Sequence, residues 1–279
     1  MATTFNKKLH VIACITDSYF DIYRDLFDKT LPLEFDSVIL YHSRASKSLP
    51  GAVATPHFKK VNYEKLHFIR SQMNAFKGDN LLVLDLDIVF FKNFKNHLNH
   101  ALVEHDMVFQ YDESDNCIAN VGFWAMQCSG KNMDFFDKEI LPRSHALLMS
   151  REEFNKKLGG RAWDITRGWK HAWAPRYSAD ILSSHNKNYD RDGARAFDGD
   201  QCVVNAALLQ PHYGHNLNVS FLDKQCFSQA YNEENFSKNI VLYHAVGSRG
   251  QEKYSHMKKV YFEIGDKLVG NSDWRKEDK

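Results

Sequence analysis

The run NLLVLDLDIVFF, residues 80–91, constrains the fold more than any other stretch of the chain. From Leu81 onward its polar residues are Asp85 and Asp87, and every other position is apolar. A nearly continuous apolar run of this length is typical of a strand that is covered on both faces, as in the middle of a parallel sheet. The run therefore predicts an interior strand of an α/β sheet.

The two aspartates in this run need a physical explanation. Aspartate is a poor strand former and is rarely buried without a partner. If the strand stays extended, Asp85 and Asp87 face the same side, where their carboxylates repel unless a proton or cation lies between them. Ligands bind at the carboxyl ends of strands in open α/β sheets. The pair predicts a divalent-metal site that also holds a substrate phosphate; the alternative is a solvated pair at a strand exit.

The rest of the chain alternates between expected strands and helices. We expect further strands at residues 9–15, 35–41, 107–111, 117–127, 219–222 and 240–244, with 219–222 in a small mixed sheet. We expect helices at residues 17–29, 63–76, 93–104, 131–158 (with a possible break at Pro142), 198–209 and 254–268, and loops at 43–56 and 245–253. This alternation is the pattern of a doubly wound sheet.

The composition excludes several classes of protein. The 279 residues fit one large α/β domain or two small ones, and 36 basic against 35 acidic residues give a net charge of +1. This balance argues against nucleic acid or an anionic membrane as the main partner.

Residues 9–15 are too short for a signal peptide, and no run reaches the ~18 apolar residues of a membrane span. The five cysteines include no CxxC pair. Reduced thiols and a cytoplasmic location are therefore expected.

Other acidic, imidazole and cationic features suggest a site for phosphate chemistry. Asp198 and Asp200 form an acidic turn before an expected helix, and His244 ends a late strand. Mg²⁺ usually takes one or two carboxylates and substrate phosphates, whereas imidazole suits Mn²⁺ better, so adding His244 to the aspartates would favour Mn²⁺. Residues 247–253 offer backbone N–H groups and two cations to a diphosphate. The alternatives are an ordinary hydrogen-bonded histidine and a solvated loop.

Taken together, these motifs resemble those of GT-A fold glycosyltransferases. The resemblance is to the nucleotide-diphospho-sugar transferase group, which includes xylosyl-, arabinosyl- and galactosyltransferases. It implies a Rossmann-like α/β fold, with a mixed, mainly parallel central sheet flanked by helices and a small second sheet. It also implies a single domain over residues 1–270, with a nucleotide-binding half (1–111), an acceptor-binding half (112–270) and a polar tail (271–279). The motifs are the 80–91 run, a preceding helix with Lys65, Asn120-Val121-Gly122, Asp200-Gln201-x-x-x-Asn205 and His244-x-x-Gly247.

The resemblance also implies roles for individual residues. Asp85, Asp87 and His244 would bind Mn²⁺ or Mg²⁺, and the donor would be a nucleoside diphosphate sugar, UDP-linked for preference. The acceptor would be a glycan. Because the donor side is already assigned, we expect the tryptophan-rich segment 159–197 to meet it, and the expected cytoplasmic location favours glycan assembly of a bacterial or viral type. Donor-binding residues would be Thr16, Asp17 and Tyr19 for the base and ribose, Lys65 near the diphosphate, Asn120 and Gly122 at the sugar, and Gly247, Arg249 and Lys253 at the diphosphate. Asp200, and after it Asp198 and Asp164, are the catalytic candidates.

The sequence departs from the family's pattern at one position, and two functions other than glycosyl transfer also fit parts of it. The family's late motif often has a lysine three residues after its glycine, but here that position is Gly250, flanked by Arg249 and Lys253. The sequence DLDIV also fits a phosphatase of the haloacid dehalogenase type, with Asp85 as nucleophile. In those phosphatases the motif normally lies on the first strand. They also need a second aspartate late in the chain, and that position is occupied here by Val204. A non-catalytic carbohydrate-binding protein is the second alternative.

Overall fold

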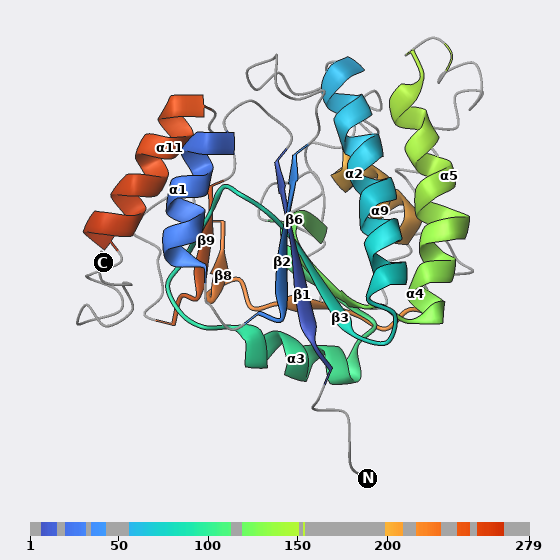
Figure 1. The fold of residues 1–279 in the computed structure, drawn as a ribbon, viewed down its shortest axis with the longest axis horizontal. Helices are drawn as coiled ribbons and strands as arrows, with labels where there is room; N and C mark the ends of the chain where they lie inside the picture. The colour runs from blue at the N-terminus through green and yellow to red at the C-terminus, as the bar shows by residue number, and fades with distance from the viewer. Residues whose placement is uncertain are drawn as a thin grey trace, which may run out of the picture.

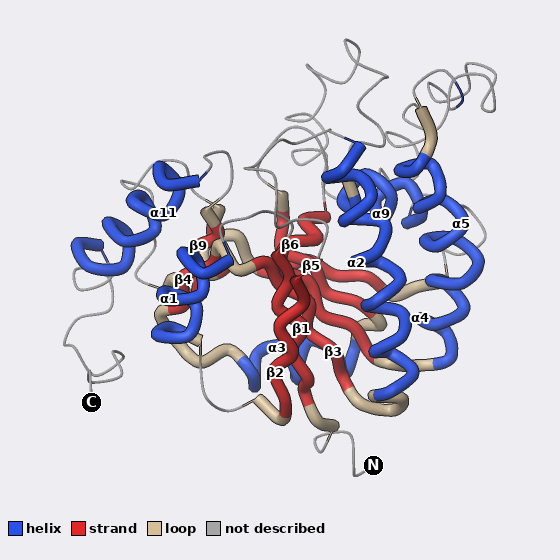
Figure 2. The backbone as a smooth tube through the Cα atoms, turned by 45° about the horizontal axis from the view of Figure 1, so that its top comes forward, coloured by secondary structure: helices blue, strands red, loops and turns tan. Residues whose placement is uncertain are grey.

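A computed structural model of the chain shows a sheet flanked by helices on both faces (Figures 1 and 2). It describes residues 7–15, 20–31, 35–42, 56–112, 119–150, 153, 199–208, 216–229, 239–245 and 250–264. In both views α2, α9, α4 and α5 lie on one side of the sheet, while α1 and α11 lie on the other side beside a smaller sheet. The predicted fold class, a mainly parallel α/β sheet with a small second sheet, is confirmed.

The main sheet has six strands in the order β2-β1-β3-β6-β5-β7. Of these, β6 runs antiparallel to both of its neighbours, and the other five strands share one direction. The apolar strand β3 lies between β1 and β6, as its composition predicts. The strands are β1 (Leu9–Ile15), β2 (Ser37–His42), β3 (Asn80–Asp85), β5 (Met107–Tyr111), β6 (Ala119–Gln127) and β7 (Val219–Leu222).

Two apolar cores fill the space between this sheet and its covering layers. The alternation of β1 divides its side chains between them: Leu9, Val11 and Ala13 belong to one core, and Ile12 and Cys14 to the other. The first core includes residues of α1 (Phe20–Thr30), α3 (Lys95–Glu104) and α11 (Gly250–Lys259). The second includes residues of α2 (Pro56–Ala75), α4 (Gly130–Phe135) and α9 (Asp200–Leu208).

The prediction of one strand over residues 80–91 is wrong in a way that matters for the site. The chain bends at Leu86 and Asp87, and Ile88–Phe90 (β4) joins a second sheet of order β4-β9-β8. Its partners are β9 (Leu242–His244) and β8 (Phe227–Ser228). Both halves of the run are buried, and for this reason the apolar pattern continues across the change of sheet.

Several other element boundaries differ from those predicted. Residues 219–222 pair with β5 at the edge of the main sheet, and it is β9 that belongs to the small sheet. Helix α2 begins at Pro56 rather than at Tyr63, because proline suits the first helical position, where its missing N–H costs nothing. The helical segment 130–148 continues through Pro142, with a π-helical turn at Phe136–Ile140 leading into α5 (Leu141–Ser144) and a 3₁₀ turn at His145–Leu148.

The last helix also begins earlier than predicted, at Gly250 instead of Tyr254, and ends in a π-helical turn at Val260–Ile264. Lys253 therefore lies in the first turn of α11, where the sequence predicts a loop. Among the helices that the structure describes, none combines the length and the apolar character that a membrane crossing requires.

Candidate functional site

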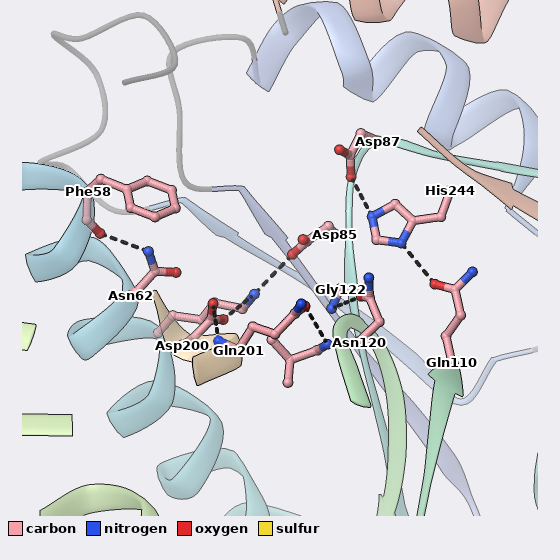
Figure 3. Close-up of polar contacts among 12 residues, drawn as sticks. Phe58, Asn62, Asp85, Asp87, Gln110, Asn120, Gly122, Asp200, Gln201 and His244 are labelled. Atoms are coloured by element: carbon pink, nitrogen blue, oxygen red, sulfur yellow. Dashed lines mark hydrogen bonds and ion pairs between the residues drawn. The ribbon is translucent and has the colours of Figure 1, made fainter. Parts of the chain in front are cut away.

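The three predicted metal ligands come together where the two sheets meet (Figure 3). Asp85 ends β3, Asp87 lies in the bend before β4, and His244 ends β9. Pairing of β4 with β9 places Ile88 opposite His244, and the N–H of Ala245 donates to the carbonyl of Asp87 at 2.9 Å. The bend and this pairing bring one potential ligand atom from each of the three residues within 4.8 Å of the others.

Two basic side chains lie against Asp87 in this structure. Lys253 forms an ion pair with one carboxylate oxygen, and Nε2 of His244 lies 3.3 Å from the other, Oδ1. Burial alone would raise the pKa of Asp87, but the Lys253 ammonium beside it holds that pKa well below its usual range. Oδ1 is buried and accepts no hydrogen bond from the described residues. Asp87 is therefore an ionised group with one oxygen left for a further cation.

A buried lysine joins the metal-ligand cluster to helix α9. Nζ of Lys65 lies 3.0 Å from Oδ1 of Asp85 and 2.9 Å from Oδ2 of Asp200, and the Lys65 side chain is 2% exposed. Burial would lower the pKa of this ammonium, but the two carboxylates raise it well above its usual value. Lys65 is thus a fixed positive charge between Asp85 and Asp200.

The environment of Asp85 differs from that of Asp87. Burial raises the pKa of Asp85; Lys65 opposes this shift, and the neighbouring Asp87 carboxylate adds to it. On the adjacent strand, Cys14 pairs in register with Asp85. Burial raises the pKa of the Cys14 thiol to about 12, although Lys65 acts in the other direction. The thiol therefore stays protonated at neutral pH, and it is not a candidate nucleophile.

Gly122 occupies the closest approach of β6 to the metal-ligand cluster. A Cβ at this position would lie 2.3 Å from Cε1 of His244 and 2.9 Å from Oδ2 of Asp85. The N–H of Gly122 donates to Oδ1 of Asn120 at 2.6 Å, so Asn120 bends back toward its own strand. The register of β5 with β6 shifts beside this point, from Phe109 opposite Trp124 to Gln110 opposite Asn120. Such irregularities are common next to active sites.

The Asp-Gln-x-x-x-Asn motif fixes α9 against β6. Asn205 accepts a hydrogen bond from the N–H of Ala119 at 3.0 Å and donates to its carbonyl at 2.7 Å. Gln201 donates to Asp112 and accepts from the N–H of Val121 at 3.4 Å. These contacts hold the start of α9, where Asp200 is 8% exposed, close to Lys65. Gln201 and Asn205 therefore set the position of Asp200.

Gln110 is a site residue that sequence reasoning missed. It lies in β5, is fully buried, and accepts a hydrogen bond at its Oε1 from Nδ1 of His244 at 2.9 Å. The sequence does carry a signal, since Gln110 is the one amide in the otherwise apolar strand MVFQY.

The structure brings together Lys65, Asp85, Asp87, Asn120, Gly122, Asp200, His244 and Lys253 among the predicted site residues (Figure 3 shows most of this group). The remaining predicted residues lie outside the described ranges: Thr16, Asp17, Tyr19, Asp164, Asp198, Gly247, Arg249 and the segment 159–197.

The residues of the cluster fit a divalent cation. Two carboxylates and one imidazole are a donor set that suits Mn²⁺. The buried Oδ1 of Asp87 has no hydrogen-bond donor among the described residues, and any side chain at position 122 would overlap His244 and Asp85. Two carboxylates this close also repel unless a positive charge lies between them.

Comparisons with solved structures return glycosyltransferases at low identity. A glycosyltransferase involved in the glycosylation of the major capsid of PBCV-1 is 11% identical over 91% of this chain and 100% of its own, at a TM-score of 0.49. Mouse xyloside xylosyltransferase 1 is 11% identical over 86% of this chain and 97% of its own, at 0.41. The glycosyltransferase GlyE of Streptococcus pneumoniae is 11% identical over 94% of this chain and 62% of its own, at 0.42.

The family assignment rests on the sequence rather than on these structures, because each TM-score is below 0.5. A search of curated proteins returns no significant match. The sequence profile of the nucleotide-diphospho-sugar transferases matches residues 33–257, which is most of the chain and includes Asp85, Asp87, Asp200 and His244. The chain therefore belongs to the nucleotide-diphospho-sugar transferase family and is a glycosyltransferase.

Proposed function

We propose that this glycosyltransferase depends on Mn²⁺ and moves a UDP-linked sugar, xylose or a similar one, to a glycan hydroxyl. The observation that carries the proposal is the convergence of Asp85, Asp87 and His244, whose ligand atoms lie within 4.8 Å of one another. The division into a nucleotide-binding half (1–111) and an acceptor-binding half (112–270) is part of the same proposal. The phosphatase alternative is set aside because the family match spans residues 33–257.

The chemistry of the reaction suits these charges. Breaking a sugar–diphosphate bond leaves negative charge on the diphosphate, and positive groups fixed beside it lower the barrier. Asp85, Asp87 and His244 would hold a divalent cation, whose chemistry there would be to supply positive charge to the leaving diphosphate. Lys253, which pairs with Asp87 at the start of α11, adds a second positive charge within reach of the same group.

The sugar side of the proposed site is built around Asp200. Lys65 fixes its carboxylate through a 2.9 Å ion pair, and the next residue of α9, Gln201, accepts a hydrogen bond from the N–H of Val121 in β6. We assign Asp200 to contact the reacting sugar or to accept the proton of the acceptor hydroxyl, since an inverting transfer needs a carboxylate within hydrogen-bond reach. Asp198 and Asp164 remain the next candidates for that base.

A thermal-shift screen tests the proposal directly. A ligand that binds only the native state raises its melting temperature, by an amount that grows with ligand concentration over Kd. We expect UDP and UDP-sugars to raise the melting temperature only when Mn²⁺ is present. Stabilisation by GDP instead of UDP would correct the donor. Equal stabilisation with and without a divalent ion would contradict the metal site, and binding without any sugar release would favour the carbohydrate-binding alternative.

Gly122→Ala is expected to weaken Mn²⁺ binding by about 10-fold, the lower end of what disturbing a ligand's surroundings costs. The added Cβ would lie 2.3 Å from Cε1 of His244 and 2.9 Å from Oδ2 of Asp85, so these two proposed ligands must shift from their present positions. Isothermal titration with Mn²⁺ measures the effect. Gly130→Ala is the matched control, because a Cβ there meets nothing within 4 Å. Unchanged Mn²⁺ affinity in Gly122→Ala would show that His244 is not a ligand.

A further inference from the structure

We infer that Gln110 is a positioning residue that fixes both the orientation of the His244 ring and the hydrogen that the ring carries, so that Nε2 faces the metal. The inference rests on the proposed metal site and extends it. Nothing in the sequence motifs points to this residue, because Gln110 lies outside all of them. The evidence is the pattern of hydrogen bonds around its amide.

Gln110 connects the two sheets. It belongs to β5 of the main sheet, whereas both groups that accept from its amide nitrogen belong to β8 of the small sheet. Nε2 of Gln110 donates to the carbonyl of Phe227 at 3.1 Å and to that of Ser228 at 3.3 Å. Its oxygen faces His244 at the end of β9, the neighbour of β8. Figure 3 shows Gln110 and Asp87 on opposite sides of the His244 ring.

The hydrogen-bond pattern leaves one orientation for the Gln110 amide. A primary amide has two N–H hydrogens and one oxygen, and main-chain carbonyls can only accept. Because both carbonyls lie at the nitrogen end, the oxygen must face His244. That oxygen can also only accept, so Nδ1 of His244, 2.9 Å away, must carry a hydrogen. The main chain of β8 therefore determines which nitrogen of His244 is protonated.

The consequence appears at the other ring nitrogen. In a neutral imidazole with its hydrogen on Nδ1, Nε2 presents a lone pair. Nε2 lies 3.3 Å from Oδ1 of Asp87, which has no hydrogen-bond donor among the described residues. The lone pair of Nε2 and the carboxylate oxygen Oδ1 face each other at a distance at which both can coordinate one cation. Ligating histidines commonly give their other N–H to an acceptor that fixes the tautomer, and here that acceptor is an amide held by main-chain carbonyls.

A purely structural role is the competing explanation. Gln110 is fully buried and joins two sheets, so its loss lowers stability even if His244 plays no part in metal binding. The test must therefore separate stability from the chemistry of His244. Phe136→Leu offers a matched control, because this fully buried side chain stacks on Trp124 in the second core and lies outside the hydrogen bonds that orient Gln110.

The experiment compares wild type, Gln110→Met and Phe136→Leu by Mn²⁺ titration followed by electron paramagnetic resonance. We expect Gln110→Met to bind Mn²⁺ about 10- to 100-fold more weakly, and the pulsed spectrum to lose its coupling to a ligating imidazole nitrogen. Phe136→Leu should melt at a lower temperature but keep the wild-type affinity and coupling. Wild-type affinity and coupling in Gln110→Met would overturn the inference, whereas absence of Mn²⁺ binding in the wild type would overturn the metal site itself.

A measurement on the metal-free wild type applies even if Gln110→Met does not fold. Long-range ¹H–¹⁵N spectra report which ring nitrogen of a histidine carries hydrogen, and the His244→Gln variant identifies the relevant signal by its loss. We expect hydrogen on Nδ1 of His244. A ring with a bare Nδ1 and hydrogen on Nε2 would overturn the inference, whatever the metal affinity.

Discussion

Asp87→Ala is expected to abolish glycosyl transfer, with a fall in kcat of at least about 10²- to 10³-fold, the range for losing one fixed electrostatic contact to the leaving charge. The variant removes a proposed metal ligand whose carboxylate is held ionised by Lys253. The Mn²⁺-dependent thermal shift with UDP should be lost as well. Sugar release from UDP-sugar, followed with and without an acceptor, measures the effect on catalysis.

The control for this variant is an aspartate of similar chemistry away from the site. Asp134 pairs with Lys138 at 2.7 Å on the surface of α4, where its side chain is 44% exposed. Asp134→Ala should keep wild-type activity, since an exposed ion pair contributes little. Circular dichroism confirms that Asp87→Ala is folded. An Asp85→Ala/Asp87→Ala double variant with full activity would rule out the proposed function.

Lys65→Met is expected to destabilise the protein by about 3 kcal/mol, the lower end of the cost of removing one partner from a buried ion pair. Its ammonium is 2% exposed and pairs with both Asp85 and Asp200. Methionine fills the same space but leaves the Asp200 carboxylate, whose side chain is 11% exposed, without that cation. The lower end is appropriate because the Asp85 side chain is 34% exposed and partly screened by solvent. Urea denaturation at pH 7 measures the change.

Two further variants separate the ion pair from simple packing. Lys65→Met/Asp200→Asn removes the uncompensated carboxylate together with the lysine, and it should recover part of the lost stability. Lys131→Met, which removes an exposed lysine paired with Asp106 at 2.5 Å, should cost less than about 1 kcal/mol. If Lys65→Met proves as stable as wild type, Lys65 does not neutralise the buried carboxylates.

The sequence predicts the main sheet and the chemical groups of the candidate site well, for identifiable reasons. The 80–91 run is apolar enough to predict an interior strand, and Asp85 at the end of that strand lies together with Asp87 and His244, as expected. His244 was expected beside them because it ends a late strand and matches a family motif. Residues 9–15 form β1 with the predicted bounds, since this apolar stretch is flanked by polar residues.

What the sequence did not reveal depends on tertiary structure. An apolar run gives no sign that Asn80–Asp85 and Ile88–Phe90 belong to different sheets, because both are buried. The two-residue strand β8 is too short to give a periodic pattern, so the carbonyls that orient Gln110 could not be foreseen. Lys65 was expected near the diphosphate; that role stays a prediction, and the pairing of Lys65 with Asp200 depends on the docking of α9.

The change of sheet between Asp85 and Ile88 also determines when the site can exist during synthesis. The parallel core β2-β1-β3 is encoded within the first 85 residues, whereas the third proposed ligand, His244, is added 157 residues after Asp87 (244 − 87). Contacts between residues so distant in sequence form late, because a long loop must close before they give any stabilisation. A nascent chain can therefore form the early strands, with Asp85 and Asp87 in place, before His244 has been synthesised. The proposed metal site is complete only once the last strand of the small sheet has been made.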